Sequence, residues 1–548
     1  MKLLTFIDQE STESYQQILV MALISGVANG LLLTIVNHAA DQVAKGEDLT
    51  QFFILYLLAF LLFLYGQWFA FAQAIVAIES ALHNNRLRLV NKIRQVELSF
   101  MESLGQHDLH AQLTQNNALL SQAIPQITSA AQVSILLVFA LLYLAFISPL
   151  SFLLMVAAIA AGMMLFMAQS HWIKQELLVG KQQEQQAFAL LAHLLQGFKE
   201  IRLNRLKNAA IIQDISVSSQ LAKATRIEAG RQEVKMWGFG RVFIYAIMPL
   251  LLFIIPNFDP TQTGNIFKIT ATLLFMTGPI SILVNSLPLL NRITLAIDDL
   301  HQLEALMNQA TPDQANEQAT PLPTDFQRIV LDDLSFTYPN GNGDSFTIGP
   351  LQQTFHAGEL VFIIGSNGSG KSTFLKLLTG LYYPSSGTIQ VDEQCIQADN
   401  QQAYRELFST VFTDFHLFDK LYGLETLDPA QVAYWLEKMQ LQHKVQWQNG
   451  GFTTTNLSTG QRKRLAFIAA VLEDKPILVL DEFAADQDPN FREYFYQTLL
   501  QELKAAGKTI IAVTHDDHYF QVAERVIKMD EGQLASYRQT LKAAAAEA

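Results

Sequence analysis

The sequence predicts two joined domains: a membrane α-helical domain of six spanning helices, followed by a soluble α/β domain. Long apolar runs lie almost entirely before residue 300. Charged residues make up only 16% of the chain and its mean hydropathy is +0.19, whereas soluble domains carry about 25% charged residues. After residue 324, short β-branched runs alternate with helical ones, which is typical of an α/β domain. A chain of 548 residues also exceeds what one core holds.

Six apolar runs have nearly the length that a helix needs to cross a bilayer, which is about 20 residues. Any single run is also compatible with a buried helix of a soluble core, but six runs with almost no interior charge favour a membrane domain. Only Ser148 and Pro149 separate the third and fourth runs, which predicts a tight hairpin. The predicted spans are Ile18–Val36, Phe52–Ile78, Ile127–Ile147, Leu150–Met167, Trp237–Ile255 and Ile269–Leu290.

Basic residues indicate how the spans are oriented, because cytoplasmic connections are enriched in lysine and arginine. The connections after the second and fourth spans are basic, whereas the opposite connections offer only Lys45 and Lys268. We therefore expect both termini to be cytoplasmic. Helical patterning predicts that both connections prolong the membrane helices into the cytosol, with polar turns near Leu104–Leu113 and Ala187–Leu194 that contact a cytosolic domain. The basic residues are Arg86, Arg88, Lys92 and Arg94, and then Lys174, Lys181, Lys199, Arg202, Arg205, Lys207, Lys223, Arg226, Arg231 and Lys235.

A linker is predicted at residues 309–324, because QATPDQANEQATPLPT combines three prolines with small polar side chains. The predicted domains are therefore 1–308, which spans the membrane, and 325–548, which is soluble. No secretory signal peptide is expected, since Lys2 is followed by the acid Asp8 and no small-residue cleavage site precedes the first span.

Composition excludes two classes of function. The 37 basic and 50 acidic residues give a formal net charge of −13, which offers no support for nucleic-acid binding, because nucleic acid requires a basic surface. The single cysteine, Cys395, excludes an internal disulfide and a multi-cysteine zinc site. We expect Cys395 to be a buried small apolar residue.

A phosphate-binding loop is predicted directly after the apolar strand Leu360–Ile364. The segment GSNGSGKST at Gly365–Thr373 matches G-x-x-x-x-G-K-[ST], and a helical stretch follows it, as the motif requires. Glycines let backbone N–H groups converge on phosphate oxygens, and the helix N-terminus favours their negative charge. Lys371 is expected to reach the β- and γ-phosphates of ATP, and the Ser372 hydroxyl to bind Mg²⁺. The predicted nucleotide-binding residues of the loop are Gly365, Ser366, Asn367, Gly368, Ser369, Gly370, Lys371, Ser372 and Thr373.

An acidic pair follows a second apolar strand, Ile477–Leu480. Asp481 is expected at the carboxyl end of a central strand, where it would hold Mg²⁺ through water. Glu482, the next residue, is expected to polarise the attacking water as a general base. An acidic pair after a strand is by itself usually a solvated strand end. Together with the phosphate loop, however, the pair favours nucleotide hydrolysis.

The pentad Leu457–Gln461, LSTGQ, resembles the LSGGQ signature of ABC-type ATPases, with Thr459 in place of the first glycine. The order along the chain also fits that family: phosphate loop, signature, acidic strand end, and then a histidine after the strand Thr509–Val513. The resemblance implies a switch histidine at the γ-phosphate, an aromatic side chain stacked on adenine, and nucleotide contacts from the signature and the D-loop. The matching residues are His515 as switch histidine, Tyr338 as the aromatic, Ser458, Gly460 and Gln461 in the signature, and Asp488 in the D-loop.

The resemblance also implies how the chain works. In that family, two nucleotide domains pair head to tail, and each ATP lies between the phosphate loop of one and the signature of the other. This chain carries one set of motifs, so the expected unit is a homodimer of half-transporters in a bacterial inner membrane. Six spans before one ATPase domain is the type IV exporter layout, with ATP and Mg²⁺ as cofactors. The two basic connections would then be the coupling segments.

Besides Thr459, two segments depart from the family pattern. Thr413 stands where the family carries the glutamine of the Q-loop, and it is too short to reach Mg²⁺ in the same way. Asp414 would either bind Mg²⁺ through water or serve a structural role at the coupling interface. The glycine-rich Gly450–Phe452 also stands where many exporters carry an acidic cross-talk loop.

The departures resemble one subgroup of ABC exporters, which exports cyclic peptides, microcin J-type lasso peptides and precursors of pyoverdine-type siderophores. The shared segments are VFTD at Val411–Asp414, LSTGQRKR at Leu457–Arg464, DEFAADQDP at Asp481–Pro489 and THDDHYF at Thr514–Phe520. This resemblance implies a peptide or peptide-like substrate.

Two other functions stay open. An exporter of lipid or hydrophobic drug would have the same fold, and the polar residues within the spans are equally compatible with substrate contacts and with hydrogen bonds between helices. An ATP-gated channel or regulatory subunit is disfavoured by the intact Glu482 and His515. A peptidase-coupled exporter is not expected, because no cysteine precedes the first span. The polar residues in question are Gln67, Gln73, Tyr143, Asn285 and Asn291.

Overall fold

The chain folds into two compact units. The computed structural model describes residues 2–10, 15–46, 48–104, 106–249, 265–311, 322–323, 325–338, 346–424 and 426–536. The first unit comprises Met1–Asn91 and His107–Ala305, and the second comprises Lys92–Gln106 and Leu306–Ala548. The second unit thus includes a short segment, Lys92–Gln106, that lies far from the rest of it in sequence. The predicted linker 309–324 and the alanine-rich C-terminal end fall largely outside the described residues.

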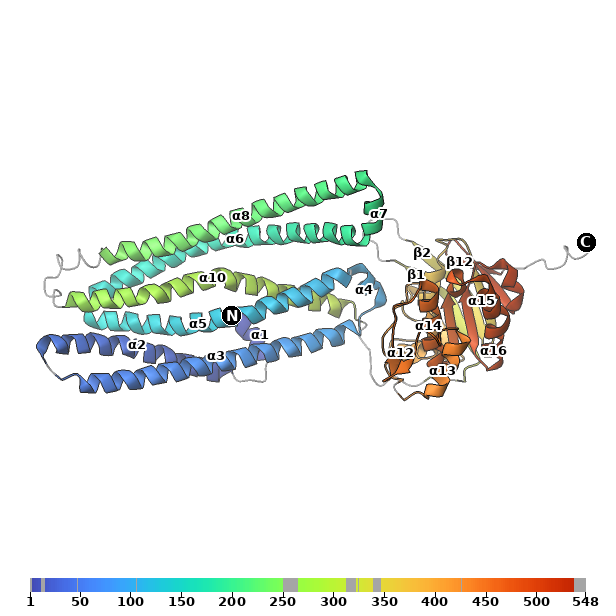
Figure 1. Cartoon of the computed structure of the whole chain (residues 1–548), viewed down its shortest axis with the longest axis horizontal. Helices are drawn as coiled ribbons and strands as arrows, with labels where there is room; N and C mark the ends of the chain where they lie inside the picture. Colours follow the sequence, from blue (N-terminus) through green and yellow to red (C-terminus); the bar gives the residue numbers. More distant parts are fainter. Residues whose placement is uncertain are drawn as a thin grey trace, which may run out of the picture. The chain divides into compact units, whose positions relative to one another are not determined.

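The first unit consists of long helices that lie side by side in Figure 1. Within the described residues, four helical segments are long and apolar enough to cross a membrane, and Pro149–Met164 is a shorter apolar helical segment. These segments contain the first, second, third and sixth predicted spans and most of the fourth. The fifth predicted span begins in α8 and continues outside the described residues. The helices are α1 (Lys2–Glu10), α2 (Tyr15–Lys45), α3 (Thr50–Ile93), α5 (Gln106–Ile147), α6 (Pro149–Gln196), α7 (Phe198–Leu203), α8 (Arg205–Pro249) and α10 (Ile266–Gln309).

The helix α3 shows how the first unit packs. Large apolar side chains such as Phe53 and Trp68 are about two-thirds exposed, at 67% and 68%, whereas its buried positions are mostly small. Membrane helices pack in this way, because small residues let their backbones approach while large apolar residues face lipid. The 44 residues of α3 span roughly 66 Å at 1.5 Å per residue, about twice the hydrocarbon thickness of a bilayer. The small buried residues of α3 are Ala59, Gly66, Ala70, Ala74, Ala77 and Ala81.

Two predicted turns had different outcomes. The hairpin at Ser148 and Pro149 is confirmed: α5 ends at Ile147 and Ser148 caps α6, its hydroxyl accepting a hydrogen bond from the Ser151 amide. The turn predicted at Ala187–Leu194 is wrong, because these residues are helical within α6. Their alanines and leucines are strong helix formers, and the helix ends instead at Gly197, the residue before α7.

The second unit is an α/β domain with a six-stranded sheet and a four-stranded antiparallel sheet (Figure 1). The six strands lie in the order β12-β11-β3-β10-β9-β6, and all except β12 are parallel to their neighbours. The strands of this sheet are β3 (Leu360–Ile364), β6 (Phe408–Val411), β9 (Ile477–Asp481), β10 (Thr509–Val513), β11 (Arg525–Asp530) and β12 (Gln533–Ser536). The four-stranded sheet contains β1 (Arg328–Thr337), β2 (Thr347–His356), β4 (Ser386–Val391) and β5 (Gln394–Cys395).

The central strands are buried on both faces. In β3, Leu360 and Phe362 belong to one hydrophobic cluster, whereas Val361 and Ile363 belong to another. Successive side chains of a strand point to opposite faces of the sheet, so a continuous apolar run is what a doubly covered parallel strand requires. The predicted strand bounds at β3 and β10 agree with the structure, and β9 extends the predicted strand by one residue.

Helices and short strands complete the second unit. Cys395 is half-buried at the end of β5 rather than buried, because β5 is an edge strand. Asn449 and Gly450 form the turn between β7 (Trp447–Gln448) and β8 (Gly451–Phe452), both at positive φ, as a tight hairpin favours. The helices are α4 (Leu98–Leu104), α11 (Lys371–Leu378), α12 (Gln401–Arg405), α13 (Pro429–Lys438), α14 (Thr459–Leu472), α15 (Pro489–Tyr494) and α16 (Leu500–Ala505).

Candidate nucleotide site

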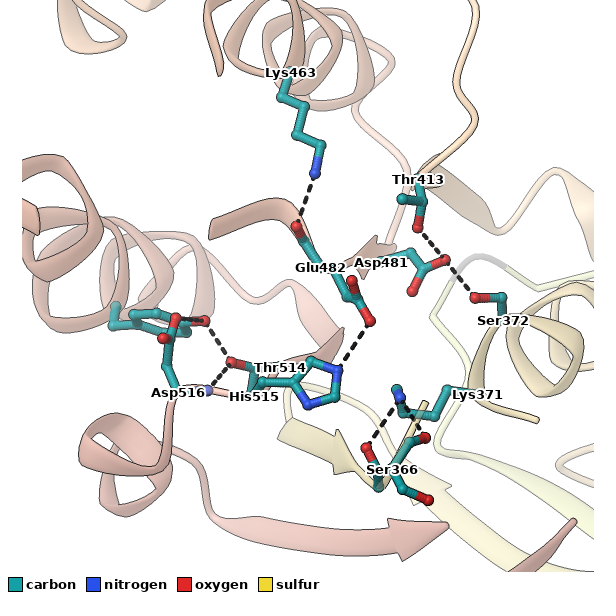
Figure 2. A network of polar contacts seen from close by, with 12 residues as sticks. Ser366, Lys371, Ser372, Thr413, Lys463, Asp481, Glu482, Thr514, His515 and Asp516 are labelled. Atoms are coloured by element: carbon teal, nitrogen blue, oxygen red, sulfur yellow. Dashed lines mark hydrogen bonds and ion pairs between the residues drawn. The ribbon is translucent and has the colours of Figure 1, made fainter. Parts of the chain in front are cut away.

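The predicted site residues gather because parallel strands end at one edge of a sheet, where α/β proteins bind their ligands. The phosphate loop follows β3, and Thr413 lies two residues beyond the end of β6. Asp481 ends β9, and His515 lies two residues beyond the end of β10. Figure 2 shows that these four segments bring polar side chains together.

The phosphate loop takes the conformation that its glycines permit. Gly368 and Gly370 have φ of 82° and 100°, in the left-handed region that favours glycine. The Lys371 side chain is buried, and its Nζ donates hydrogen bonds of 3.0 Å to the carbonyl oxygens of Gly365 and Ser366. An ammonium group has three protons, so this anchoring leaves one donor for a phosphate oxygen.

Asp481 is the centre of the predicted magnesium site. Its Oδ2 accepts hydrogen bonds from the Ser372 hydroxyl at 2.9 Å and from the Thr413 hydroxyl at 2.8 Å (Figure 2). Its Oδ1 is buried and has no hydrogen-bond partner among the residues that the structure describes. A buried carboxylate oxygen is costly unless it is satisfied, and a hydrated Mg²⁺ would satisfy it. The residues present therefore fit the ion, with Ser372 and Asp481 as the groups that would hold it.

Glu482 and His515 form a hydrogen-bonded pair, with 3.0 Å between the Glu482 Oε1 and the His515 Nε2. Glu482 lies at φ 49° and ψ 40°, a left-handed conformation that is rare for glutamate and common at functional sites. Two contacts hold its backbone there: its N–H donates to the Val513 carbonyl, and its own carbonyl accepts from Lys463 Nζ at 3.0 Å. Both side chains stay partly exposed, at 30% for Glu482 and 46% for His515, so water and phosphate can reach them.

A second network fixes the residues on either side of His515. The Thr514 hydroxyl lies 2.6 Å from the Tyr496 hydroxyl and accepts a hydrogen bond from the Asp516 amide. Tyr496 also donates to the Asp516 carboxylate at 3.0 Å, and Arg492 forms an ion pair with that carboxylate at 3.2 Å. The backbone that carries His515 is therefore anchored on both sides.

The signature is folded as a helix N-terminus. Ser458 caps α14 through a capping box in which the Gln461 side chain accepts a hydrogen bond from the Ser458 amide. Gly460 leaves no room for a side chain, because a Cβ there would lie 2.6 Å from the Asp486 carbonyl oxygen. The Gln487 side-chain Nε2 donates a hydrogen bond of 3.1 Å to the Gly460 carbonyl. The signature and the D-loop are thus packed directly on each other.

Asp488 has a capping role within the chain. It caps α15 by accepting a hydrogen bond from the Phe491 amide at 3.0 Å, and it pairs with Arg464 at 2.8 Å. The Phe491 amide and then Arg464 hold the pKa of Asp488 below its usual value. Lys463, next to Arg464, forms an ion pair with Asp486. These two basic residues belong to the basic run Arg462–Arg464 that follows the LSTGQ pentad, and that adjacency is the signal that could have revealed their roles.

Tyr338, the predicted adenine-stacking residue, belongs to a hydrogen-bonded chain. Its hydroxyl lies 3.0 Å from the Thr373 hydroxyl and 3.4 Å from the Tyr382 hydroxyl. Tyr382 is buried and donates a hydrogen bond of 2.5 Å to the carboxylate of Glu102, a residue of α4. Sequence reasoning missed Tyr382 and Glu102, and no motif in the sequence marks either residue.

The same Glu102 carboxylate forms an ion pair with Lys376 at 2.7 Å. Burial lowers the pKa of Lys376, but the hydrogen bond and charge of Glu102 outweigh it, so the pKa is raised overall. The charge of Asp414 acts in the same direction. The charge of Asp414 therefore acts on Lys376, whereas its neighbour Thr413 donates a hydrogen bond to Asp481.

A site of this kind can hold a nucleoside triphosphate and activate water beside it. The same chain supplies helices long enough to cross a membrane, so the fold and the site together define a transport ATPase.

Comparison with known proteins places the chain more closely. Residues 348–485 match the family described as ABC transporter. The ATP-binding protein SyrD of Pseudomonas syringae pv. syringae is 33% identical over 547 residues, which cover 94% of this chain and 93% of SyrD. The solved structure of a bacterial Atm1-family ABC exporter with ATP bound has a TM-score of 0.80 at 16% identity, covering 94% of this chain and 93% of its own.

Two further relatives match only part of the chain. The lactococcin-A transport/processing ATP-binding protein LcnC of Lactococcus lactis subsp. lactis is 26% identical over 50% of this chain and 38% of its own length. An ATP-dependent lipid A-core flippase of Saccharophagus degradans is 32% identical over 43% of this chain and 42% of its own. The chain belongs to the ABC transporter family, as an exporter half-transporter whose ATP hydrolysis is coupled to transport.

Proposed function

We propose that this protein exports a peptide or peptide-like substrate, such as a cyclic or lasso peptide or a siderophore, across the bacterial inner membrane. The observation that carries the proposal is the pair Glu482–His515 beside the Asp481 carboxylate, in a chain related to SyrD along nearly its whole length. The substrate class rests on the VFTD, LSTGQRKR and THDDHYF segments, which resemble those of cyclic-peptide exporters. The likeness to LcnC, which is named for lactococcin-A transport, adds support.

Each site residue has a part in hydrolysis. The backbone of the phosphate loop and Lys371 would bind the phosphates, and Tyr338 would stack on adenine. Mg²⁺, held by Ser372 and Asp481, would neutralise charge on the β- and γ-phosphates. Glu482 would orient the attacking water and accept its proton. The hydrogen bond from His515 would fix the Glu482 carboxylate, and the same imidazole would contact the γ-phosphate.

We propose that the working unit is a homodimer embedded in membrane lipid, with both termini in the cytoplasm. Each chain carries one phosphate loop and one signature, so head-to-tail pairing of two copies gives two complete sites, with Ser458, Gly460 and Gln461 of one copy facing the nucleotide of the other. Asp488 would keep its capping role within its own chain and set the D-loop in that interface.

A lipid or hydrophobic compound is the second candidate substrate, because part of the chain also resembles a protein named as a lipid A-core flippase. Both candidate substrates are compatible with the same fold, and the relatives that cover only part of the chain do not separate them. They are therefore separated by experiment on the purified protein.

The test uses the purified full-length protein in liposomes that contain a fluorescent lipid analogue. Liposomes in which the ATPase domain faces outward should accumulate a labelled lasso or cyclic peptide only with ATP and Mg²⁺. The peptide should also stimulate ATP turnover. Accumulation that persists in Glu482→Gln would overturn ATP-driven transport. If the lipid analogue stimulates ATP turnover and is moved across the bilayer while the peptide has no effect, the lipid alternative is established. ATP turnover no higher than in Lys371→Ala would indicate a channel or regulatory subunit.

A further inference from the structure

The Thr413 hydroxyl makes a contact that has no part in the roles proposed above for the site residues. Thr413 stands where the family carries glutamine, and its Oγ1 lies 2.8 Å from Asp481 Oδ2. Ser372 donates to that same oxygen at 2.9 Å. Two hydroxyl groups therefore occupy Oδ2, and the buried Oδ1 is the oxygen left without a partner.

This arrangement fixes the rotation of the carboxylate. An aspartate side chain rotates about the bond that carries its carboxyl group, and that torsion has no sharp preference of its own. Donors from two different segments, the loop that follows β6 and the first turn of α11, hold Oδ2 in place. With Oδ2 fixed, Oδ1 is directed to a side where no donor of the described part of the chain meets it.

We propose that Thr413 is a positioning residue for the magnesium site: its hydroxyl orients Asp481 so that Oδ1 is presented to Mg²⁺ or to a water bound to it. The inference rests on the nucleotide-hydrolysing function and adds a residue to it. Thr413 replaces the metal-directed glutamine by acting through the aspartate rather than by reaching the ion itself. Groups that orient a metal ligand commonly contribute about ten- to hundredfold to metal affinity.

The experiment measures metal binding apart from turnover. Full-length protein in nanodiscs is loaded with ADP, and Mn²⁺ is titrated while electron paramagnetic resonance reports the free ion. Thr413→Val keeps the branched shape and removes the hydroxyl, so we expect the Mn²⁺ dissociation constant of the ADP complex to rise at least about tenfold. Thr413→Ser keeps the hydroxyl and should restore affinity to within about twofold of the wild type, because the same charge-assisted hydrogen bond forms.

A matched control lies on the strand that precedes Thr413. Ser409, in β6, is buried, whereas Thr413 is more exposed, and the Ser409 hydroxyl donates to a different carboxylate, that of Glu473, at 3.0 Å. Ser409→Ala removes a hydroxyl of the same kind at a distance from the magnesium site. We expect this variant to bind Mn²⁺ as the wild type does.

The outcomes distinguish a failure of the positioning role of Thr413 from a failure of the nucleotide-hydrolysing function. Wild-type Mn²⁺ affinity in Thr413→Val, or an equal loss in Thr413→Ser or Ser409→Ala, would overturn the positioning role while leaving the ATPase in place. Binding of ADP in EDTA should be unchanged in Thr413→Val, and a loss there would also contradict the proposal, because it would indicate a distorted loop. Failure of the wild type itself to bind Mn²⁺ with ADP would instead contradict the nucleotide site.

Discussion

At the residue scale, the most informative position is Glu482. Its left-handed backbone is unfavourable for a glutamate, and the Lys463 side chain and the Val513 carbonyl both bind the peptide groups that hold it there. Backbone strain that the surroundings maintain is common where a side chain must point in one direction. Here that direction brings the carboxylate to His515.

The first prediction concerns this carboxylate. Glu482→Gln should lower ATP turnover by at least about 100-fold, the usual contribution of a general base, while nucleotide binding persists. Phosphate release and binding of a fluorescent ATP analogue measure the two effects. Lys371→Ala serves as the contrasting variant, because it should lose binding as well as turnover. Turnover of Glu482→Gln within a few-fold of the wild type would exclude Glu482 as the base.

The second prediction concerns the signature glycine. Gly460→Ala places a Cβ 2.6 Å from the Asp486 carbonyl oxygen, so the signature must move away from the D-loop. We expect ATP turnover to fall about tenfold or more, as misplacement by about 1 Å can cost 100-fold, with unchanged binding at the phosphate loop. Thr459→Gly, the adjacent change, restores the common family residue and should keep activity. Equal activity of Gly460→Ala and wild type would contradict the tight packing.

At the element scale, α4 contacts the rest of the second unit through the Glu102 carboxylate and through Leu98, which packs against its hydrophobic core. Glu102 accepts hydrogen bonds from Tyr382 and Lys376, and Tyr382 contacts Tyr338. The helix of the first basic connection is therefore linked through hydrogen bonds to the residue expected to stack on adenine. Such a chain offers a route between this connection and the nucleotide.

The third prediction tests that chain. Tyr382→Phe removes only the hydroxyl between Glu102 and Tyr338, and it should raise the KM for ATP about two- to tenfold, as loss of one hydrogen bond does. The neighbouring Tyr383 packs against Arg405, so Tyr383→Phe is the matched control and should leave KM unchanged. An unchanged KM in Tyr382→Phe would show that the chain does not influence adenine binding.

The fourth prediction concerns the contact of α2 with α5. A Cβ at Gly30 would lie 2.1 Å from the Phe139 ring, so Gly30→Ala should force these helices apart. The cost of such overpacking is about 1–3 kcal/mol, which should lower the apparent melting temperature in detergent. Gly278→Ala, in α10, meets nothing within 4 Å and should melt no lower than the wild type. A melting temperature for Gly30→Ala at or above that of Gly278→Ala would contradict the close approach.

At the scale of the whole molecule, one chain holds one phosphate loop and one signature, and the proposed sites need one from each of two copies. In a symmetric dimer the same surface serves both subunits. If one chain carries both a phosphate-loop defect and a signature defect, the two defects fall on different sites. If each chain carries one of the defects, both fall on the same site and the other site is intact.

The fifth prediction uses this pairing of motifs from two chains. A heterodimer of a Lys371→Ala chain and a Gly460→Ala chain, isolated with two tags, has one site with both defects and one site with neither. It should recover turnover to about half of the wild type or less, whereas the Lys371→Ala homodimer should be inactive and the Gly460→Ala homodimer should keep about a tenth of wild-type turnover or less. If phosphate loop and signature of one chain formed the same site, both sites would be defective and no activity would return.

The sequence by itself determined the membrane character, the phosphate loop and the acidic strand end, because these depend on local composition and on fixed spacing. Tertiary structure decided what spacing cannot show. Glu102 and Tyr382 are 280 residues apart and meet only through folding, and the turn at Gly197 depended on where the helical run ended, which the alanine- and leucine-rich sequence before it does not mark. The role of Thr413 was equally hidden, because a threonine after a strand acquires meaning only when the Asp481 carboxylate lies 2.8 Å away.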